Sequence, residues 1–439
     1  MRKLKMDVSK DLVALDVLSV LQLRTGNESL LPGLRVFECE AVSEAFAPFI
    51  PLFLSPGTIN IGIKFDENTP TVMVASTIAQ FSTLCPNIRS LLLDLLPNDQ
   101  VIAEAVSEML LACNRDALQV LFVNSPLTEV AYGFLHTLPK LRKLWLFTEG
   151  QTSFPRLALP DLDMVFIGWE SSDWLQGFCG ATIGKLDTVI LHHASGSAQT
   201  GAFLEEFQSV ALTTSLQNTL SKFEFRTSQS WSPNYSSLLV FKQMQTLEIQ
   251  FSCRNGCSST VDDDTVTNLA RAMPKLKILR LGGAPCRALT GIALKGLVAL
   301  ACHCPQLSEL RIHVQAEELG EATTTTEPPH LSGNSAVIPR ANCALTILQV
   351  GEAPIPQEVT PAVALILLKV FPQILKVEHV DPRWGSVVEM IKHFRWIGGH
   401  VDHTSKAYLL YLKCSLVTPH QETHLCRKSV QRQEAQRCL

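Results

Sequence analysis

The chain has 439 residues, of which 46% are hydrophobic and 18% charged, and this composition excludes a wholly disordered protein. The formal net charge of -4 at pH 7 is too small to indicate nucleic acid or an anionic membrane as a partner. Thirteen cysteines without a secretory signal predict reduced thiols rather than a disulfide framework.

The N-terminal segment, residues 1–30, starts with basic residues but is not a signal peptide, because Asp7, Asp11 and Asp16 interrupt any apolar run. Val8 and the leucines that follow it at helical spacing predict a helical cap. The most apolar run, residues 363–371, is far shorter than the roughly 20 residues that a membrane span needs. We therefore expect no membrane partner and a cytoplasmic or nuclear location.

A short apolar motif, L-x-x-L-x-L, recurs along the chain and is clearest at Leu141, Leu144 and Leu146. A further strand is predicted over residues 59–65, where apolar residues alternate with others. The motif is the strand signature of a leucine-rich repeat. Its copies, some of them degenerate, begin at Leu34, Ile88, Leu118, Leu141, Leu162, Leu186, Leu220, Met244, Leu276, Leu307, Leu345 and Ile374.

Segments with helical periodicity lie between the strands, at residues 101–112, 265–273, 292–302 and 361–371. Neither a single strand nor a single helix can bury its apolar face alone, so neighbouring repeats must stack. The predicted fold is an α/β leucine-rich-repeat solenoid over residues 31–397, with a parallel sheet on the concave face and helices on the convex face. We expect an irregular horseshoe, because residues such as Pro126 and Glu149 replace the usual Asn or Cys of the turn.

Two segments do not fit the repeat. Residues 317–342 contain four consecutive threonines, prolines and glycine, and we expect a mobile surface loop there. In residues 398–439 the chain becomes polar and basic after Leu416, and we expect a C-terminal cap followed by a disordered tail.

The fifth place of the motif points to the concave face, because successive side chains of a strand alternate. From Phe122 to Ile190 this row is apolar and aromatic, and we predict that it docks a protein target. The alternative is that a loop or the C-terminal segment covers it. The candidate residues of this part are Phe122, Trp145, Phe166 and Ile190, with Phe147 at the neighbouring seventh place.

The row then becomes charged, with Glu224 and Glu248 followed by Arg280 and Arg311. These four side chains could recognise a bipolar peptide. The alternative is that they pair with one another across neighbouring strands.

Metal and catalytic sites have little support. Cys253 and Cys257, the segment 302–304 and the pair His192–His193 are ligand types, but none has the spacing of a zinc finger. The chain also lacks a G-x-S-x-G motif, a phosphate-binding glycine loop and H-E-x-x-H. We predict no cofactor, no metal and no enzymatic activity.

Segments at residues 23–38, 47–61, 83–93 and 261–282 resemble fungal F-box/leucine-rich-repeat proteins. The resemblance extends over about residues 12–397. It implies the substrate-receptor part of a cullin–RING ubiquitin ligase, in which the F-box binds the adaptor and the repeats bind the target.

The F-box itself is missing from the resemblance, because only about thirty residues precede the first repeat. The resemblance implies that residues 1–30 are the linker that normally follows an F-box, which is the alternative to a helical cap. Either the gene model is truncated, which we favour, or the repeat protein has lost its link to a ligase. The expected function is target recognition, with adaptor binding only if an F-box lies upstream. The alternatives are a free-standing repeat scaffold and a receptor for a small ligand on the concave face.

Overall fold

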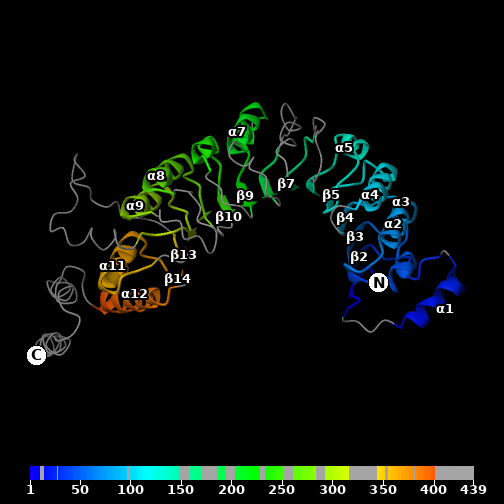
Figure 1. Ribbon diagram of the computed structural model, residues 1–439, viewed down its shortest axis with the longest axis horizontal. Helices are drawn as coiled ribbons and strands as arrows, with labels where there is room; N and C mark the ends of the chain where they lie inside the picture. The colour runs from blue at the N-terminus through cyan, green and yellow to red at the C-terminus, as the bar shows by residue number, and fades with distance from the viewer. Residues whose placement is uncertain are drawn as a thin grey trace, which may run out of the picture. The chain divides into compact units, whose positions relative to one another are not determined.

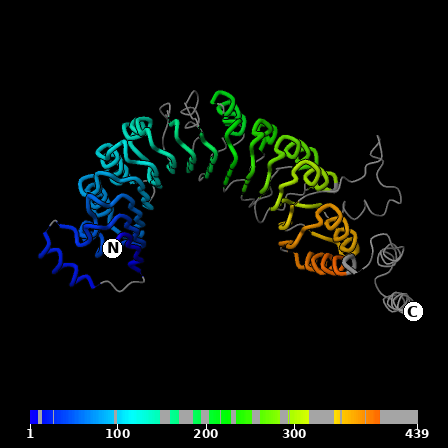
Figure 2. Tube along the Cα trace, turned by 180° about the vertical axis from the view of Figure 1, so that it is seen from behind, coloured from blue at the N-terminus to red at the C-terminus, as the bar shows by residue number. Residues whose placement is uncertain are grey.

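The computed structural model describes residues 1–9, 14–26, 28–95, 99–147, 159–169, 185–193, 203–214, 216–227, 233–251, 261–282, 292–315, 344–351, 354–379 and 381–400. The predicted loop 317–342 and, of the predicted C-terminal segment, residues 401–439 lie outside these ranges. The chain divides into two units, Met1–Met244 and Gln245–Leu439. In both units strands alternate with helices along the chain (Figures 1 and 2).

The strands of the first unit form a parallel sheet in chain order. The strands after β1 lie where the recurring motif predicts them or, for β3, where alternating apolar residues do. Strand β1 instead falls inside the segment predicted as a helical cap. That segment therefore opens with a strand, which pairs with β2, and its helix starts only at Leu15. The described strands are β1 (Lys3–Asp7), β2 (Val36–Val42), β3 (Asn60–Phe65), β4 (Ser90–Asp94), β5 (Val120–Val123), β6 (Lys143–Phe147), β7 (Met164–Trp169), β8 (Thr188–His193) and β9 (Lys222–Thr227).

The helices that connect these strands lie on one face of the sheet (Figure 1). The predicted helix 101–112 is confirmed as α4. Described helical segments of the first unit are α1 (Leu15–Thr25), η1 (Ala47–Phe53), α2 (Thr71–Ala79), α3 (Phe81–Leu84), α4 (Gln100–Ala112), α5 (Glu129–Leu135), α7 (Phe203–Thr214), η3 (Leu216–Asn218) and η4 (Tyr235–Leu238).

The second unit repeats this plan with parallel strands in chain order. The three helices predicted from periodicity are found here as α8, α9 and α11. Its described elements are β10 (Thr246–Phe251), α8 (Asp263–Ala272), β11 (Ile278–Leu281), α9 (Leu294–His303), β12 (Glu309–Arg311), β13 (Ile347–Gly351), η5 (Gln357–Val359), α11 (Thr360–Val370), β14 (Lys376–His379) and α12 (Arg383–His400). The fold is an α/β solenoid of the leucine-rich-repeat type, as predicted.

One backbone carbonyl per repeat fixes the register of the sheet. The residue before each strand accepts hydrogen bonds from two consecutive N–H groups of the following repeat. The carbonyl of Gln119 accepts from Arg142 and Lys143, and that of Arg142 accepts from Asp163 and Met164. The same pattern recurs at Arg35, Ile59 and Arg89 in the first unit and at Gln245, Lys277, Ser308 and Thr346 in the second. Stacking thereby satisfies the polar backbone at the point where each strand begins.

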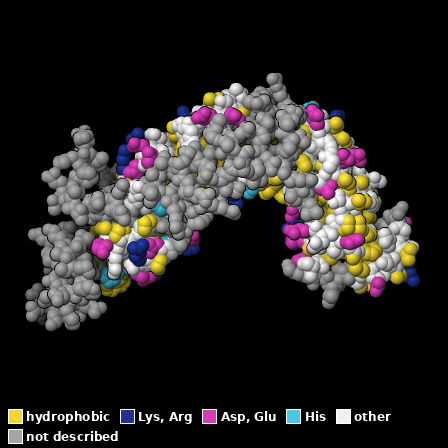
Figure 3. Space-filling model, in the orientation of Figure 1, with side chains coloured by type: hydrophobic (Ala, Val, Ile, Leu, Met, Phe, Trp, Pro, Cys, Tyr) yellow, Lys and Arg dark blue, Asp and Glu magenta, His cyan; other side chains and the backbone are white. Residues whose placement is uncertain are grey.

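The leucines of the motif form the core between sheet and helices. Leu141 and Leu144 are 1% and 2% exposed, and Leu146 is fully buried. Side chains at the places between them point to the opposite face of the sheet, which none of the described helices of the first unit covers (Figure 1). We call this the open face. Some apolar side chains of the helices are exposed, such as Val72 on α2 and Val101 on α4. Figure 3 shows hydrophobic side chains interspersed with other surface atoms over this part of the chain.

Side-chain oxygens cap three of the described helices, α4, α5 and α8. The Asp99 carboxylate accepts from the N–H groups of Val101 and Ile102 at the start of α4, and Thr128 accepts from Ala131 at the start of α5. Asp262 accepts from the N–H of Thr265 at the start of α8. Each cap satisfies donors that the first helical turn leaves without partners.

Candidate protein-binding site

The sheet of the first unit brings the predicted apolar side chains into one row on the open face. Leu92 faces Phe122 across β4 and β5, and Phe122 faces Trp145 across β5 and β6. Trp145 then faces Phe166, and Phe166 faces Ile190. The fifth places of the motif are therefore direct neighbours, as the sequence predicts. We call Phe122, Trp145 and Phe166 the aromatic row.

The rings of the aromatic row are in contact with one another. Trp145 and Phe166 stack with their centroids 3.3 Å apart and an interplanar angle of 15°. Phe122 lies 4.3 Å from Trp145 at 45°. The ring of His192 meets Phe166 edge-on at 4.6 Å. Edge-to-face packing, as between Phe166 and His192, stabilises rings beyond their buried area. The contacts of Trp145 with Phe122 and Phe166 join the row into one platform.

Exposure divides the predicted residues into two groups. Leu92 is 41% exposed, and Phe122, Trp145 and Phe147 are half-buried. Phe166 and Ile190 are only 4% and 8% exposed, so they support the platform and present little surface themselves. The surface that a partner could touch is therefore narrower than the sequence predicts, and its centre lies at Phe122 and Trp145.

Phe147 is held at the end of β6 by two neighbours. Its backbone carbonyl accepts a hydrogen bond of 3.1 Å from the buried hydroxyl of Tyr132. Its ring lies across the backbone of Gly168 on β7, where a Cβ atom would come within 2.6 Å of Phe147 Cδ2. The glycine thus provides the space in which the Phe147 ring lies beside the aromatic row.

His192 closes the row on the side of β8. Burial lowers the pKa of His192, and the nearby Arg226 lowers it further, against the opposing effect of Glu224. Its Nε2 atom is buried and has no hydrogen-bond partner. The neutral imidazole is therefore the favoured form at pH 7, and it packs on Phe166 as an aromatic ring.

The predicted charged residues pair with other side chains of the sheet. Glu224 is 6% exposed and forms ion pairs with Lys222, at 3.4 Å, and with Arg226 on its own strand. In the second unit the Arg280 guanidinium joins Glu248 at 2.9 Å and Glu309 at 2.8 Å, on the strands to either side. The hydrogen bond that Arg280 donates to Glu309, together with the charge of Glu248, raises the pKa of Arg280.

Arg311 faces Arg280 across β11 and β12 and is half-buried. Of the four charged candidates, Arg280 thus forms the cross-strand pairs that were the alternative to peptide recognition. Glu224 pairs along its own strand, which the motif did not predict.

Asn124, which the sequence reasoning did not single out, supports the turn beside the row. Its side-chain oxygen accepts from the Leu95 N–H at 2.6 Å, and its amide nitrogen donates to Asp94 at 2.7 Å. These two hydrogen bonds join the ends of β4 and β5. The sequence signal for this role is an Asn at the seventh place, directly after the motif. It does not occupy the usual turn position, which Pro126 holds.

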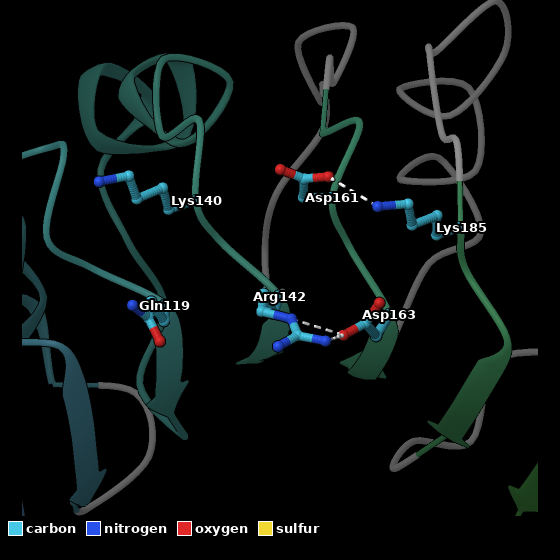
Figure 4. A pocket seen from close by; sticks show the side chains of 6 residues that line it. All are labelled: Gln119, Lys140, Arg142, Asp161, Asp163 and Lys185. Atoms are coloured by element: carbon cyan, nitrogen blue, oxygen red, sulfur yellow. Dashed lines mark hydrogen bonds and ion pairs between the residues drawn. The ribbon is translucent and has the colours of Figure 1, made fainter.

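A cavity of about 440 Å³ lies at the edge where the strands of the first unit begin, away from the aromatic row. Figure 4 shows its residues in two ranks on consecutive repeats, with Arg142 paired to Asp163 and Lys185 paired to Asp161. Gln119 and Lys140 complete the lining. The cavity is lined by polar side chains, five of the six being charged, unlike the apolar pockets that usually hold small organic ligands.

The part of the chain that the structure describes contains neither a candidate metal site nor a candidate membrane-spanning helix. No three His, Cys, Asp or Glu side chains there could hold a metal ion together. Burial raises the pKa of Cys302, which shifts this thiol away from the thiolate form that binds metals. Cys253 and Cys257 lie outside the described residues. Among the described helices, none combines the length and the apolar character needed to cross a bilayer.

Comparison with known proteins gave no family model and no curated protein that matches the chain. Among solved structures, the chain is similar to one in the crystal structure of the yeast Rad7 and Elc1 complex, with 13% identity and a TM-score of 0.41, over 73% of this chain and 70% of that one. It is also similar to a protein from Bacteroides fragilis, with 9% identity and a TM-score of 0.32, over 78% and 74% of the two chains. The fold itself is established by the register of the strands, which makes this chain a solenoid of the leucine-rich-repeat type.

Proposed function

We propose that the chain is a protein-recognition subunit whose target binds the open face of the first unit at Phe122 and Trp145. The observation that supports this proposal is the half-exposed aromatic pair at the centre of a rigid stacked row. Large aromatic side chains that are already ordered lose little conformational entropy on binding, and they dominate the energetics of protein interfaces.

The surroundings of the pair fit an interface. Leu92 extends the apolar surface on β4, and Lys143, which is exposed, lies on the same strand as Trp145. The surface therefore has an apolar centre with polar groups beside it, an arrangement typical of protein-binding sites. The resemblance to F-box/leucine-rich-repeat proteins suggests that the bound target is presented for ubiquitination.

A matched pair of substitutions tests the binding site. Trp145→Ser removes the centre of the aromatic row, whereas Val130→Ser removes an apolar side chain of α5 that is 68% exposed on the helical side. Quantitative affinity purification from cells compares both variants with the wild-type chain, after circular dichroism has shown that all three are folded. A genuine target is retained by the wild type and by Val130→Ser and is lost from Trp145→Ser.

The purified target is then titrated by isothermal calorimetry. We expect Trp145→Ser to weaken its affinity by about 30-fold, corresponding to about 2 kcal/mol for a residue at the centre of an interface. Equal affinity of all three chains for every target would contradict the proposed site. A target whose cellular half-life does not lengthen when this chain is deleted would contradict the role in ubiquitination while leaving the binding site intact.

A further inference from the structure

The residues that directly precede the strands of the first unit form a row of their own along the edge where the strands begin. The doubled hydrogen bonds to their carbonyls set this order, because each of these residues is tied to the equivalent residue of the next repeat. The row across β1 to β6 reads Arg2, Arg35, Ile59, Arg89, Gln119 and Arg142.

This edge is strongly basic. The segments before β1 to β6, residues 1–2, 31–35, 55–59, 85–89, 113–119 and 138–142, together with Lys143 at the start of β6, contain one acidic residue, Asp116. They contain seven basic residues, all exposed, which we call the basic edge: Arg2, Arg35, Arg89, Arg115, Lys140, Arg142 and Lys143. Arg142 pairs with Asp163, and no ion pair within the described part of the chain neutralises any of the other six.

The excess of positive charge on the basic edge destabilises the folded chain, because like charges repel one another. This excess is also local, since the chain as a whole carries a net charge of -4. The basic edge is therefore an attractive surface for an anionic partner and not a consequence of overall composition.

The spacing of the arginines indicates the form of that partner. Arg35, Arg89 and Arg142 lie two strands apart from one another in the row, which corresponds to about 9.6 Å at the usual strand separation of about 4.8 Å. A polyproline II chain rises about 3.1 Å per residue and has three residues per turn, so every third side chain points the same way at intervals of about 9.3 Å. The spacing of the arginines therefore matches the spacing of every third side chain in such a segment.

We propose that the basic edge binds an acidic segment of a protein in the polyproline II conformation, with Asp or Glu at every third residue. Successive carboxylates of the segment then pair with Arg35 and Arg89. The next carboxylate lies beside Arg142 and pairs with Lys140 and Lys143, because Arg142 already pairs with Asp163. Arg2 extends the contact at the other end. This surface is distinct from the aromatic row, and the inference does not depend on the function proposed above.

A single-stranded nucleic acid fits the basic edge less well. Proteins that bind single strands stack bases on aromatic side chains, and the described segments before β1 to β6 contain none. Beyond Arg142 the basic edge does not continue, because Asp163 pairs with Arg142 and Asp161 pairs with Lys185 (Figure 4). The next repeat adds a further carboxylate, Asp187. A long row of phosphates would meet these carboxylates, whereas a peptide can end or carry a basic residue there.

The test uses the full chain and a fluorescein-labelled peptide of five Glu-Pro-Pro repeats, with binding measured by fluorescence anisotropy. The comparison probes are five Gln-Pro-Pro repeats, a peptide of the same length and charge with its glutamates in one block, and a single-stranded oligonucleotide with the same number of charges. We expect the wild-type chain to bind the Glu-Pro-Pro peptide at least tenfold more tightly than each comparison probe, and to bind it more weakly as salt is raised.

Two double variants place the site on the chain. Arg35→Glu with Arg89→Glu reverses the charge of the basic edge and should weaken binding of the Glu-Pro-Pro peptide at least tenfold. Lys242→Glu with Lys277→Glu makes the same change in charge at exposed positions before strands β10 and β11 and should leave the affinity within twofold of the wild type.

Equal loss in both double variants would show that only net charge matters and would overturn the proposed site. Tighter binding of the oligonucleotide, or equal binding of the block peptide, would overturn the proposed partner. Trp145→Ser should bind the peptide as the wild type does, which separates this result from the test of the aromatic row.

Discussion

Gly168 decides how Phe147 packs beside the aromatic row. Leu, Ile and Phe residues of the motif could be assigned to the core or to the open face from their spacing alone. The role of Gly168 could not, because it depends on a side chain from the preceding strand crossing its backbone. The close approach of the Phe147 ring became visible only when β6 and β7 were placed side by side.

We predict that Gly168→Ala lowers the free energy of unfolding by about 1–3 kcal/mol, because the new methyl group would overlap the Phe147 ring. Urea denaturation of the variant measures the loss. In the background of Phe147→Ala, which removes the ring, the same Gly168→Ala substitution should have almost no effect. A loss of equal size in both backgrounds would show that backbone conformation, and not the contact with Phe147, requires the glycine.

The aromatic row also shows how far a single residue can be interpreted from the sequence. Phe122, Trp145, Phe166 and Ile190 were assigned to adjacent places, and the register of β5 to β8 confirms their order. Their exposure was not predictable, because Phe166 is enclosed by rings from both neighbouring strands, Trp145 and His192. Burial of this kind depends on the neighbours in space and not on the strand that carries the residue.

Helices were predictable from their apolar stripes, with or without a capping residue, since α9 and α11 have no side-chain cap. The acidic run before α8 favoured a helix start, and in the structure Asp262 caps that helix through the N–H of Thr265. Strand β1 was not predictable, because its sequence KLKMD is short and basic and has no copy of the repeat motif. Its conformation is fixed by pairing with β2, in which Lys3 faces Val36 and Lys5 faces Glu38.

We predict that Asp262→Ala destabilises the protein by about 1 kcal/mol at pH 7, the usual contribution of an N-cap. The hydrogen bonds from Thr265 lower the pKa of Asp262 below its ordinary value of 3.8. The charged cap therefore stabilises the fold above about pH 3.8, and this contribution is lost as the pH falls through the lower pKa of the folded state. Urea denaturation between pH 7 and pH 3.5 should show the difference between wild type and variant narrowing at the acid end.

The conservative variant Asp262→Asn serves as the control. Its side-chain oxygen can still accept the hydrogen bond from Thr265, but it does not titrate. It should keep most of the stability at pH 7, and its difference from Asp262→Ala should not change with pH. A constant difference between the wild type and Asp262→Ala down to pH 3.5 would argue against a charged cap.

At the scale of the whole molecule, each repeat is tied mainly to its immediate neighbours. Strands pair with the next strand in chain order, and helices such as α2 and α4 or α8 and α9 pack as consecutive neighbours. In such a solenoid the stability is close to a sum over repeats and their interfaces, so damage in one repeat should remain local.

We predict that Leu144→Ala, in which the side chain is 2% exposed, costs about 2–5 kcal/mol locally and accelerates amide hydrogen exchange in β5, β6 and β7. Leu279→Ala, at a fully buried equivalent position, should accelerate exchange in β10, β11 and β12 instead. Hydrogen-exchange mass spectrometry distinguishes the two patterns. Uniform acceleration along the chain in either variant would mean that the repeats unfold as one cooperative body.

The sequence by itself determined the repeat, the places of all the described strands except β1, and the order of side chains along the open face. This was possible because buried leucines at fixed spacing leave a stacked strand and helix as the arrangement that hides them. Only the tertiary structure decided which of those side chains stay exposed, how Arg280 joins Glu248 and Glu309, and that the arginines before the strands fall into one line. These features arise between repeats that are about 20 to 40 residues apart in the chain, where spacing within one repeat carries no information.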